Sequence, residues 1–219
     1  MARPLLDSDT IYEAALGLIE EGEPGALTAR NLATKLRCST RTLYKQVGKQ
    51  DQLIASLLDY YFRSKTPRFS FGDSWQSVVA QWSRDLREII LARPNLAAHL
   101  TPENHAPIAD YTKPLLLFLM EVGFEPTAAA DVCKSLAHVV ISLAHAEFAT
   151  QKYPTPTPTD TAMASEVTSL LYSSLAEDQA GVDPSQPPPN FLRTVEWLIK
   201  GIEAHQPVGI DQPAGIEGS

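Results

Sequence analysis

Basic side chains gather in one stretch of the chain, from Leu27 to Gln50, where no acidic residue occurs. The basic residues there are Arg30, Lys35, Arg37, Arg41, Lys45 and Lys49. Lysine and arginine bind phosphate oxygens, and short polar side chains among them can reach phosphates and base edges in the major groove. In a chain whose formal net charge is -8, this window indicates a local surface for a polyanion, with DNA as the polyanion that suits these residue types.

Two short helices around a tight turn would position these side chains. Thr28 and Ser39 are typical N-cap residues, and they predict helices over 29–36 and 40–47. The apolar residues of both segments share one side, namely Leu32, Ala33, Leu36, Leu43 and Val47. Two small helices with an apolar inner side and a basic outer side are typical of a helix-turn-helix.

A solvated helical face is the simpler explanation of most charge runs. It does not account for the missing acids, nor for the short polar residues on the basic face. Those neighbours are Ser39, Thr40 and Thr42 beside Arg41, Tyr44 and Lys45. Residues 1–65 carry nine basic and eight acidic residues, whereas residues 66–219 carry nine and eighteen. A nearly neutral head on an acidic body therefore favours contact with a polyanion at the head alone.

Apolar periodicity predicts helices throughout the chain and therefore an all-α fold. In the head, Ser8 or Asp9 would cap a first helix, and a fourth helix would cover 50–63 with Tyr61 on its apolar side. In the body, helices are predicted over 75–92, 95–100, 108–122, 126–150, 162–175 and 191–204. The prolines of 153–160 predict an extended segment. We expect a DNA-binding domain over 1–63, an all-α body domain over 64–205, and a flexible tail over 206–219.

The head carries the pattern Leu36-x-Cys38-Ser39-x-x-Thr42-Leu43-Tyr44-x-x-Val47 followed by Leu53. With this pattern it resembles the N-terminal domain of the TetR family of transcriptional repressors, and the resemblance covers residues 8–63. It implies a three-helix domain joined to the body by helix four. It also implies that bases or phosphates are contacted by Arg30, Ser39, Thr40, Arg41, Thr42, Tyr44, Lys45, Gln46 and Lys49. The chain departs from the family pattern at Arg37, where a turn glycine is usual, and at Gln50, where helix four usually opens on lysine.

The body contains the segments DSWQSVVAQW, ARPNLAAHL and EVGFEPTAAADVCKSLAHVVISLAH, with a late NFLRTVEWLIKGIEAH helix. In these segments it resembles the tetracycline repressor subgroup of that family. The resemblance implies a ligand cavity in each subunit and a homodimer through the 126–150 and 191–204 helices. Two polar drug anchors of the subgroup are replaced, one by Tyr61 or Phe62 and the other by Trp82, so we expect a largely apolar effector and not tetracycline. The candidate ligand contacts are Phe62, Trp82, Leu86, His99, Phe118, His138 and Glu147.

No catalytic, cofactor or metal site is expected. His99 and Glu147 fall near the subgroup's drug-chelated magnesium, but an exposed or interfacial position explains them as well. His138 and His145 are too far apart along one helix to bind a single metal ion. Cys38 and Cys133 lack metal or redox spacing and are expected to be buried free thiols.

These patterns together predict a cytoplasmic, ligand-responsive, homodimeric repressor of a palindromic DNA operator. A cytoplasmic location and no membrane association are expected, because the N-terminus lacks the apolar region of a signal peptide and no apolar run reaches the roughly 18–20 residues of a membrane span. Three alternatives remain. They are a transcriptional activator of the same fold, a helical small-molecule-binding dimer whose head meets a protein partner, and a helical enzyme that uses the body cavity.

Overall fold

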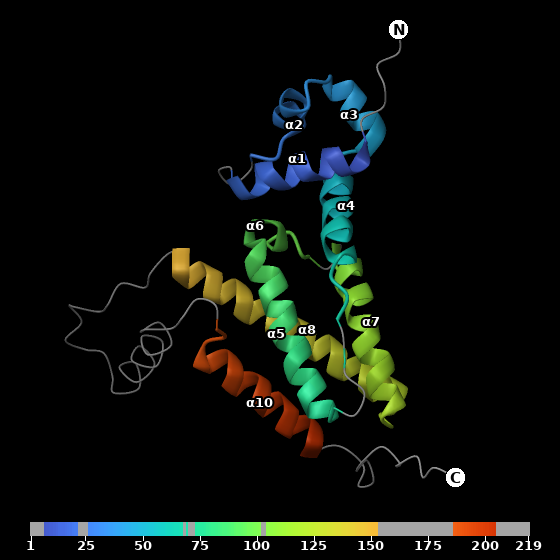
Figure 1. Ribbon diagram of the computed structural model, residues 1–219, viewed down its shortest axis with the longest axis vertical. Coiled ribbons are helices and arrows are strands. Elements are labelled where there is room, and N and C mark those ends of the chain that lie inside the picture. Colours follow the sequence, from blue (N-terminus) through green and yellow to red (C-terminus); the bar gives the residue numbers. More distant parts are fainter. Residues whose placement is uncertain are drawn as a thin grey trace, which may run out of the picture. The chain divides into compact units, whose positions relative to one another are not determined.

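The structure is a computed structural model that describes residues 7–21, 26–67, 69, 73–101, 104–152 and 186–204. These residues form only helices and no strand, which confirms the all-α fold (Figure 1). The helices are α1 Ser8–Glu21, α2 Ala29–Lys35, α3 Thr40–Val47, α4 Gln50–Arg63, α5 Trp75–Ala92, α6 Pro94–Ala97, α7 Ala106–Glu121, α8 Pro126–Lys152 and α10 Pro189–Ala204. The predicted helix over 162–175, the extended segment over 153–160 and the tail over 206–219 lie outside the described residues.

The chain divides into two compact units. Unit 1 comprises residues 1–68 and 88–114, and unit 2 comprises residues 69–87 and 115–219. The predicted domain limits at residues 63 and 205 remain predictions.

Helix α1 is the centre of unit 1, where it contacts α2, α4 and α6. Its N-terminus is capped by Asp7, whose Oδ2 accepts a hydrogen bond from the Thr10 backbone N–H at 3.3 Å. The prediction of Ser8 or Asp9 as the cap was therefore wrong, because both residues already belong to the helix. The helix buries Ile11, Ala15, Leu16 and Ile19.

The short helix α6 is joined to the C-terminal end of α1 by polar contacts. The Leu96 N–H donates to Glu20 Oε1 and the Asn95 amide donates to the Ile19 carbonyl, both at 3.3 Å. Burial of Glu20 raises the pKa of its carboxyl, while the hydrogen bond from Leu96 and the charge of Arg93 lower it. Pro94 starts α6, which ends at Ala97, so this helix is shorter than the predicted 95–100 segment.

Helix α4 joins the head to the rest of unit 1. It buries Leu53, Ile54, Leu57, Leu58 and Phe62. The apolar side of this helix thus ends with Phe62, and not with Tyr61 as predicted. Tyr61 is half-buried, and its hydroxyl donates to the Ile89 carbonyl at 2.8 Å, so burial of this polar side chain is accompanied by a hydrogen bond.

In unit 2, helix α8 packs against α10. Its buried residues are Ala129, Cys133, Leu136, Ala137, Val140 and Ala144. By length and composition, residues Pro126–Thr150 could cross a membrane, which corrects the expectation that no such run exists. Only 33% of the 18-residue apolar window in this helix is buried within the chain. The core helix of a soluble protein can be equally long and apolar. An apolar helix that is only partly covered needs a further covering surface.

The thiol of Cys133 is expected to be unreactive in the folded protein. Burial raises the pKa of this thiol to about 12, and the thiolate is the reactive form. Cys38 is only half-buried, unlike its predicted burial. Titration with a thiol reagent near pH 8 should therefore leave Cys133 unmodified until denaturant is added, with Cys38→Ser supplying the single-thiol control. Rapid modification of Cys133 in that variant without denaturant would contradict its buried position.

Candidate nucleic-acid interface

Side-chain caps build the two helices of the basic window. Thr28 Oγ1 accepts the Asn31 N–H at 3.1 Å at the start of α2, and Ser39 Oγ accepts the Thr42 N–H at 3.1 Å at the start of α3. Each cap satisfies an amide that the helix itself leaves without an acceptor. Leu32, Ala33 and Leu43 are buried beneath the pair. The predicted caps and two-helix arrangement are therefore present.

The turn between these helices passes through Arg37 in a left-handed conformation. Its φ is 51°, the only positive φ of a non-glycine residue in the described parts of the chain. The Arg37 N–H donates to the Thr34 carbonyl at 3.1 Å and the Cys38 N–H to the Ala33 carbonyl at 2.9 Å, which closes the end of α2. A residue with a Cβ pays roughly 1–2 kcal/mol in this region. Glycine would avoid that cost, so arginine at this position leaves the backbone of the turn locally strained.

Helix α3 ends at Gly48, whose φ of 71° suits a residue without a Cβ. A Cβ there would lie 2.0 Å from Gln52 Oε1, which accepts the Lys49 N–H at 2.9 Å. The next residue, Gln50, donates its side-chain amide to the Leu27 carbonyl at 3.0 Å. The glutamine at the family's lysine position thus ties α4 to the segment before α2, while the side chain of Lys49 is exposed.

Most side chains predicted to contact DNA are exposed. The exposed members are Arg30, Ser39, Thr40, Arg41, Tyr44, Lys45 and Lys49. Thr42 and Gln46 are half-buried, and Gln46 Oε1 itself is buried. The hydroxyls of Ser39 and Thr42 lie 2.8 Å apart, so both are already bonded at the start of α3. The surface therefore consists of exposed basic and aromatic groups around a capped helix start.

The charge of this surface is not balanced by acids. Within the parts of the chain that the structure describes, no carboxylate pairs with Arg30, Arg37, Arg41, Lys45 or Lys49. Elsewhere, surface cations do have carboxylate partners, as in Arg63–Asp59, Lys134–Asp131 at 3.2 Å and Lys200–Glu196 at 2.6 Å. Unpaired exposed cations attract phosphates over a distance set by the ionic strength. Helix α3 and its flanks thus form a positive surface on an acidic protein.

A cleft of about 270 Å³ lies in unit 1, at the C-terminal end of α4. Its lining consists of Asp59, Phe62, Arg63, Lys65, Thr66, Pro67, Pro107, Asp110, Tyr111 and Pro114. The rings of Phe62 and Tyr111 meet edge to face with centroids 6.1 Å apart. The cleft therefore has aromatic and proline walls, with two carboxylates and two cations among its lining residues.

The seven predicted ligand contacts are dispersed. Phe62 is the one among them that lines this cleft in the described structure. In unit 1, His99 is half-buried. In unit 2, Trp82 and Leu86 are fully buried, Phe118 is half-buried against Phe69, and His138 is exposed on α8. The predicted ligand contacts therefore do not converge on this cleft.

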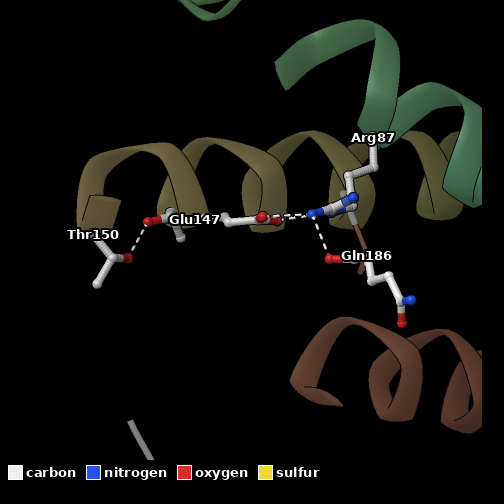
Figure 2. Close-up of polar contacts among 5 residues, drawn as sticks. Arg87, Glu147, Thr150 and Gln186 are labelled. Atoms are coloured by element: carbon white, nitrogen blue, oxygen red, sulfur yellow. Dashed lines mark hydrogen bonds and ion pairs between the residues drawn. The ribbon is translucent and has the colours of Figure 1, made fainter. Parts of the chain in front are cut away.

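Glu147 belongs to a buried ion pair in unit 2. Arg87, which is 1% exposed, donates from Nε to Glu147 Oε2 at 2.8 Å and from Nη2 to Oε1 at 2.5 Å. Figure 2 shows Arg87 also reaching the Gln186 carbonyl, at 3.2 Å. The guanidinium lies over the Phe191 ring, 5.7 Å from its centroid. Both carboxylate oxygens of Glu147 are thus engaged by Arg87, and no group of three potential metal ligands occurs in the described part of the chain.

Two curated relatives are similar to this chain in sequence. An HTH-type transcriptional regulator of Saccharopolyspora erythraea is 30% identical over 96 residues, which are 44% of this chain and 41% of that regulator. The class D tetracycline repressor of Escherichia coli is 27% identical over 208 residues, 93% of this chain and 91% of that repressor. No protein-family model matches the chain. Both relatives are named for transcriptional regulation and neither for catalysis.

Solved structures share the fold. ActR of Streptomyces coelicolor, a TetR family protein in complex with actinorhodin, has a TM-score of 0.68 at 24% identity, over 92% of this chain and 98% of that one. BioQ with its double-stranded DNA operator has a TM-score of 0.64 at 16% identity, over 91% and 99%. Together with the helix-turn-helix geometry, these likenesses show that the chain shares its fold with solved TetR family structures and is similar in sequence to a tetracycline repressor over nearly its full length.

Proposed function

We propose that this protein is a ligand-responsive transcriptional repressor that binds a palindromic DNA operator as a homodimer in the cytoplasm. The observation that supports this most is the exposed basic surface around α3, where Arg30, Arg37, Arg41, Lys45 and Lys49 pair with no carboxylate among the described residues. Residues 1–63 would form the DNA-binding domain and residues 64–205 the ligand-binding and dimerisation domain. In each subunit α3 would enter the major groove, and two subunits related by a two-fold axis would read two half-sites.

Uncovered apolar surface in unit 2 supports the homodimer through α8 and α10. On α10, Trp197 is 65% exposed and Leu192 is 42% exposed. On α8, 33% of the 18-residue apolar window is buried within the chain. Large exposed apolar side chains such as those on α10 mark an interaction site, and a second copy would present the same face.

Helix α4 offers a route from an effector to the DNA-binding surface. One end of α4 is tied to Leu27 through Gln50, and its last turn meets α1 through the hydrogen bond from the Tyr60 hydroxyl to Glu13 Oε1 at 3.0 Å. Its other end supplies Phe62 to the cleft. A ligand that moves the Phe62 end would therefore displace the helix on which α1 and α3 pack. Such a movement would change the spacing of two α3 helices across a dimer, which must match successive grooves.

The cleft suits a small effector with an apolar body. Its volume of about 270 Å³ is near the lower limit of roughly 300–1,000 Å³ for ligand pockets. Phe62 and Tyr111 would pack against the apolar body, and Asp110 or Lys65 would pair with one polar group. Native mass spectrometry of the purified protein tests this directly. A co-purified small molecule that weakens DNA binding is expected, and a bound molecule that leaves DNA binding unchanged would contradict the effector assignment.

Replacing Lys49 by alanine is expected to weaken binding about equally for operator and random DNA. Lys49 is exposed at the start of α4, and loss of one phosphate contact should reduce the salt slope of log affinity by about one unit. Arg41→Ala should instead change operator preference as well as affinity, because Arg41 would face bases. Lys113→Ala, an equal loss of charge at an exposed site on α7, is the control.

Fluorescence anisotropy over a series of salt concentrations measures all three variants. Equal affinities and equal salt slopes for Lys49→Ala and Lys113→Ala would contradict the proposed DNA-binding surface. An unchanged operator preference in Arg41→Ala would place Arg41 among the phosphate contacts.

A further inference from the structure

Arg37 combines a strained backbone with an exposed charge. Among the described residues, Arg37 is the one non-glycine residue with a positive φ. The two backbone hydrogen bonds of its turn would form equally well with glycine. Strain of this kind persists where another gain offsets it, and such sites cluster where proteins bind ligands. The backbone gives no reason for an arginine at this position, so the reason must be sought in the side chain.

The side chain of Arg37 has no partner among the residues that the structure describes. It is exposed, and it lies two residues before Ser39, the N-cap of α3. The residues that follow the cap, Thr40 and Arg41, are exposed as well. The Arg37 guanidinium therefore belongs to the turn that leads into the proposed recognition helix, and this turn would approach the DNA backbone.

We propose that Arg37 is a DNA phosphate contact, made from the turn of the helix-turn-helix and absent from the set of contacts that the family pattern implies. This inference rests on the proposed DNA-binding function. The planar guanidinium can donate two parallel hydrogen bonds to one phosphate, which favours arginine over a shorter or rounder cation. The contact carries no sequence information, so it contributes to operator and random DNA alike.

The test compares Arg37→Gly, which removes both the strain and the charge, with Arg37→Ala, which removes the charge and keeps the strained position. Both variants should bind operator and random DNA about eightfold more weakly near 0.1 M salt, and both salt slopes should fall by about 0.9 units. Thermal unfolding should separate them, because Arg37→Gly should keep or raise Tm relative to Arg37→Ala. Arg37→Lys should retain the salt slope with intermediate affinity.

Three outcomes decide between explanations. Weaker binding by both variants with an intact Tm for Arg37→Gly supports the phosphate contact. Wild-type affinity and slope in Arg37→Ala would overturn it, whether or not Arg37→Gly binds normally. If the unsubstituted protein itself binds no DNA, the proposed function fails before this inference is tested, so the two failures are distinguishable.

Discussion

Replacing Arg87 by alanine is expected to lower the free energy of unfolding by about 3–5 kcal/mol. The substitution leaves the Glu147 carboxylate, whose side chain is 15% exposed, without the two hydrogen bonds that Arg87 donates. It also removes the guanidinium from the Phe191 ring and from the Gln186 carbonyl. A half-buried carboxylate that loses both hydrogen bonds from Arg87 retains its desolvation cost, so the loss exceeds the value of the ion pair itself. Urea unfolding followed by circular dichroism measures the change.

Arg63→Ala is the matched control. Arg63 also pairs with a carboxylate, that of Asp59, but the side chains are 77% and 45% exposed. Such a surface pair contributes at most about 1 kcal/mol. Replacing both buried partners with apolar residues, Arg87→Met with Glu147→Leu, should restore most of the stability because both buried charges are removed together. A loss in Arg87→Ala no larger than that in Arg63→Ala would contradict the buried role of this pair.

Replacing Leu192 and Trp197 together by glutamate is expected to convert the proposed dimer into monomers and to weaken operator binding by about 10²–10⁴-fold. Both side chains lie exposed on α10, and two like charges would repel the same face of a second copy. A monomer brings one α3 to the operator, so the second half-site no longer adds to affinity. Sedimentation velocity measures the mass, and anisotropy on the same samples measures the affinity.

The control places the same charges on another exposed apolar pair. Leu117 and Met120 on α7 are 55% and 39% exposed, and Leu117→Glu with Met120→Glu should leave both mass and operator affinity unchanged. A dimer that survives the α10 substitutions, or dissociates with those on α7, would show that subunits associate through a different surface.

Local features of the head followed from the sequence because neighbouring residues determine them. Thr28 and Ser39 act as caps within their own helix turns, and the family pattern placed the usual glycine at the position where Arg37 adopts a positive φ. The limits of α3 and α4 agree with prediction for the same reason. The cap of α1 was misplaced by one or two residues, since Asp7, Ser8 and Asp9 all favour that position and the sequence does not distinguish them.

Sites that depend on packing between distant segments were harder to predict. Arg87 lies beside buried Leu86 in a helix that reads as amphipathic, and its pairing with Glu147 joins residues 60 positions apart. The sequence signal that could have indicated this ion pair was the arginine within the apolar stripe of its helix. Phe62 was anticipated as a ligand contact, but Asp110 and Tyr111 across the cleft were not, because no local pattern links α4 to α7.

The central claim is that the basic surface around α3 reads a specific DNA sequence. Anisotropy titrations at physiological salt should compare the DNA upstream of the protein's own coding sequence with random DNA of equal length. We expect the upstream DNA to bind at least about 10³-fold more tightly. Equal binding of both DNAs, or no binding of either, would contradict the repressor function.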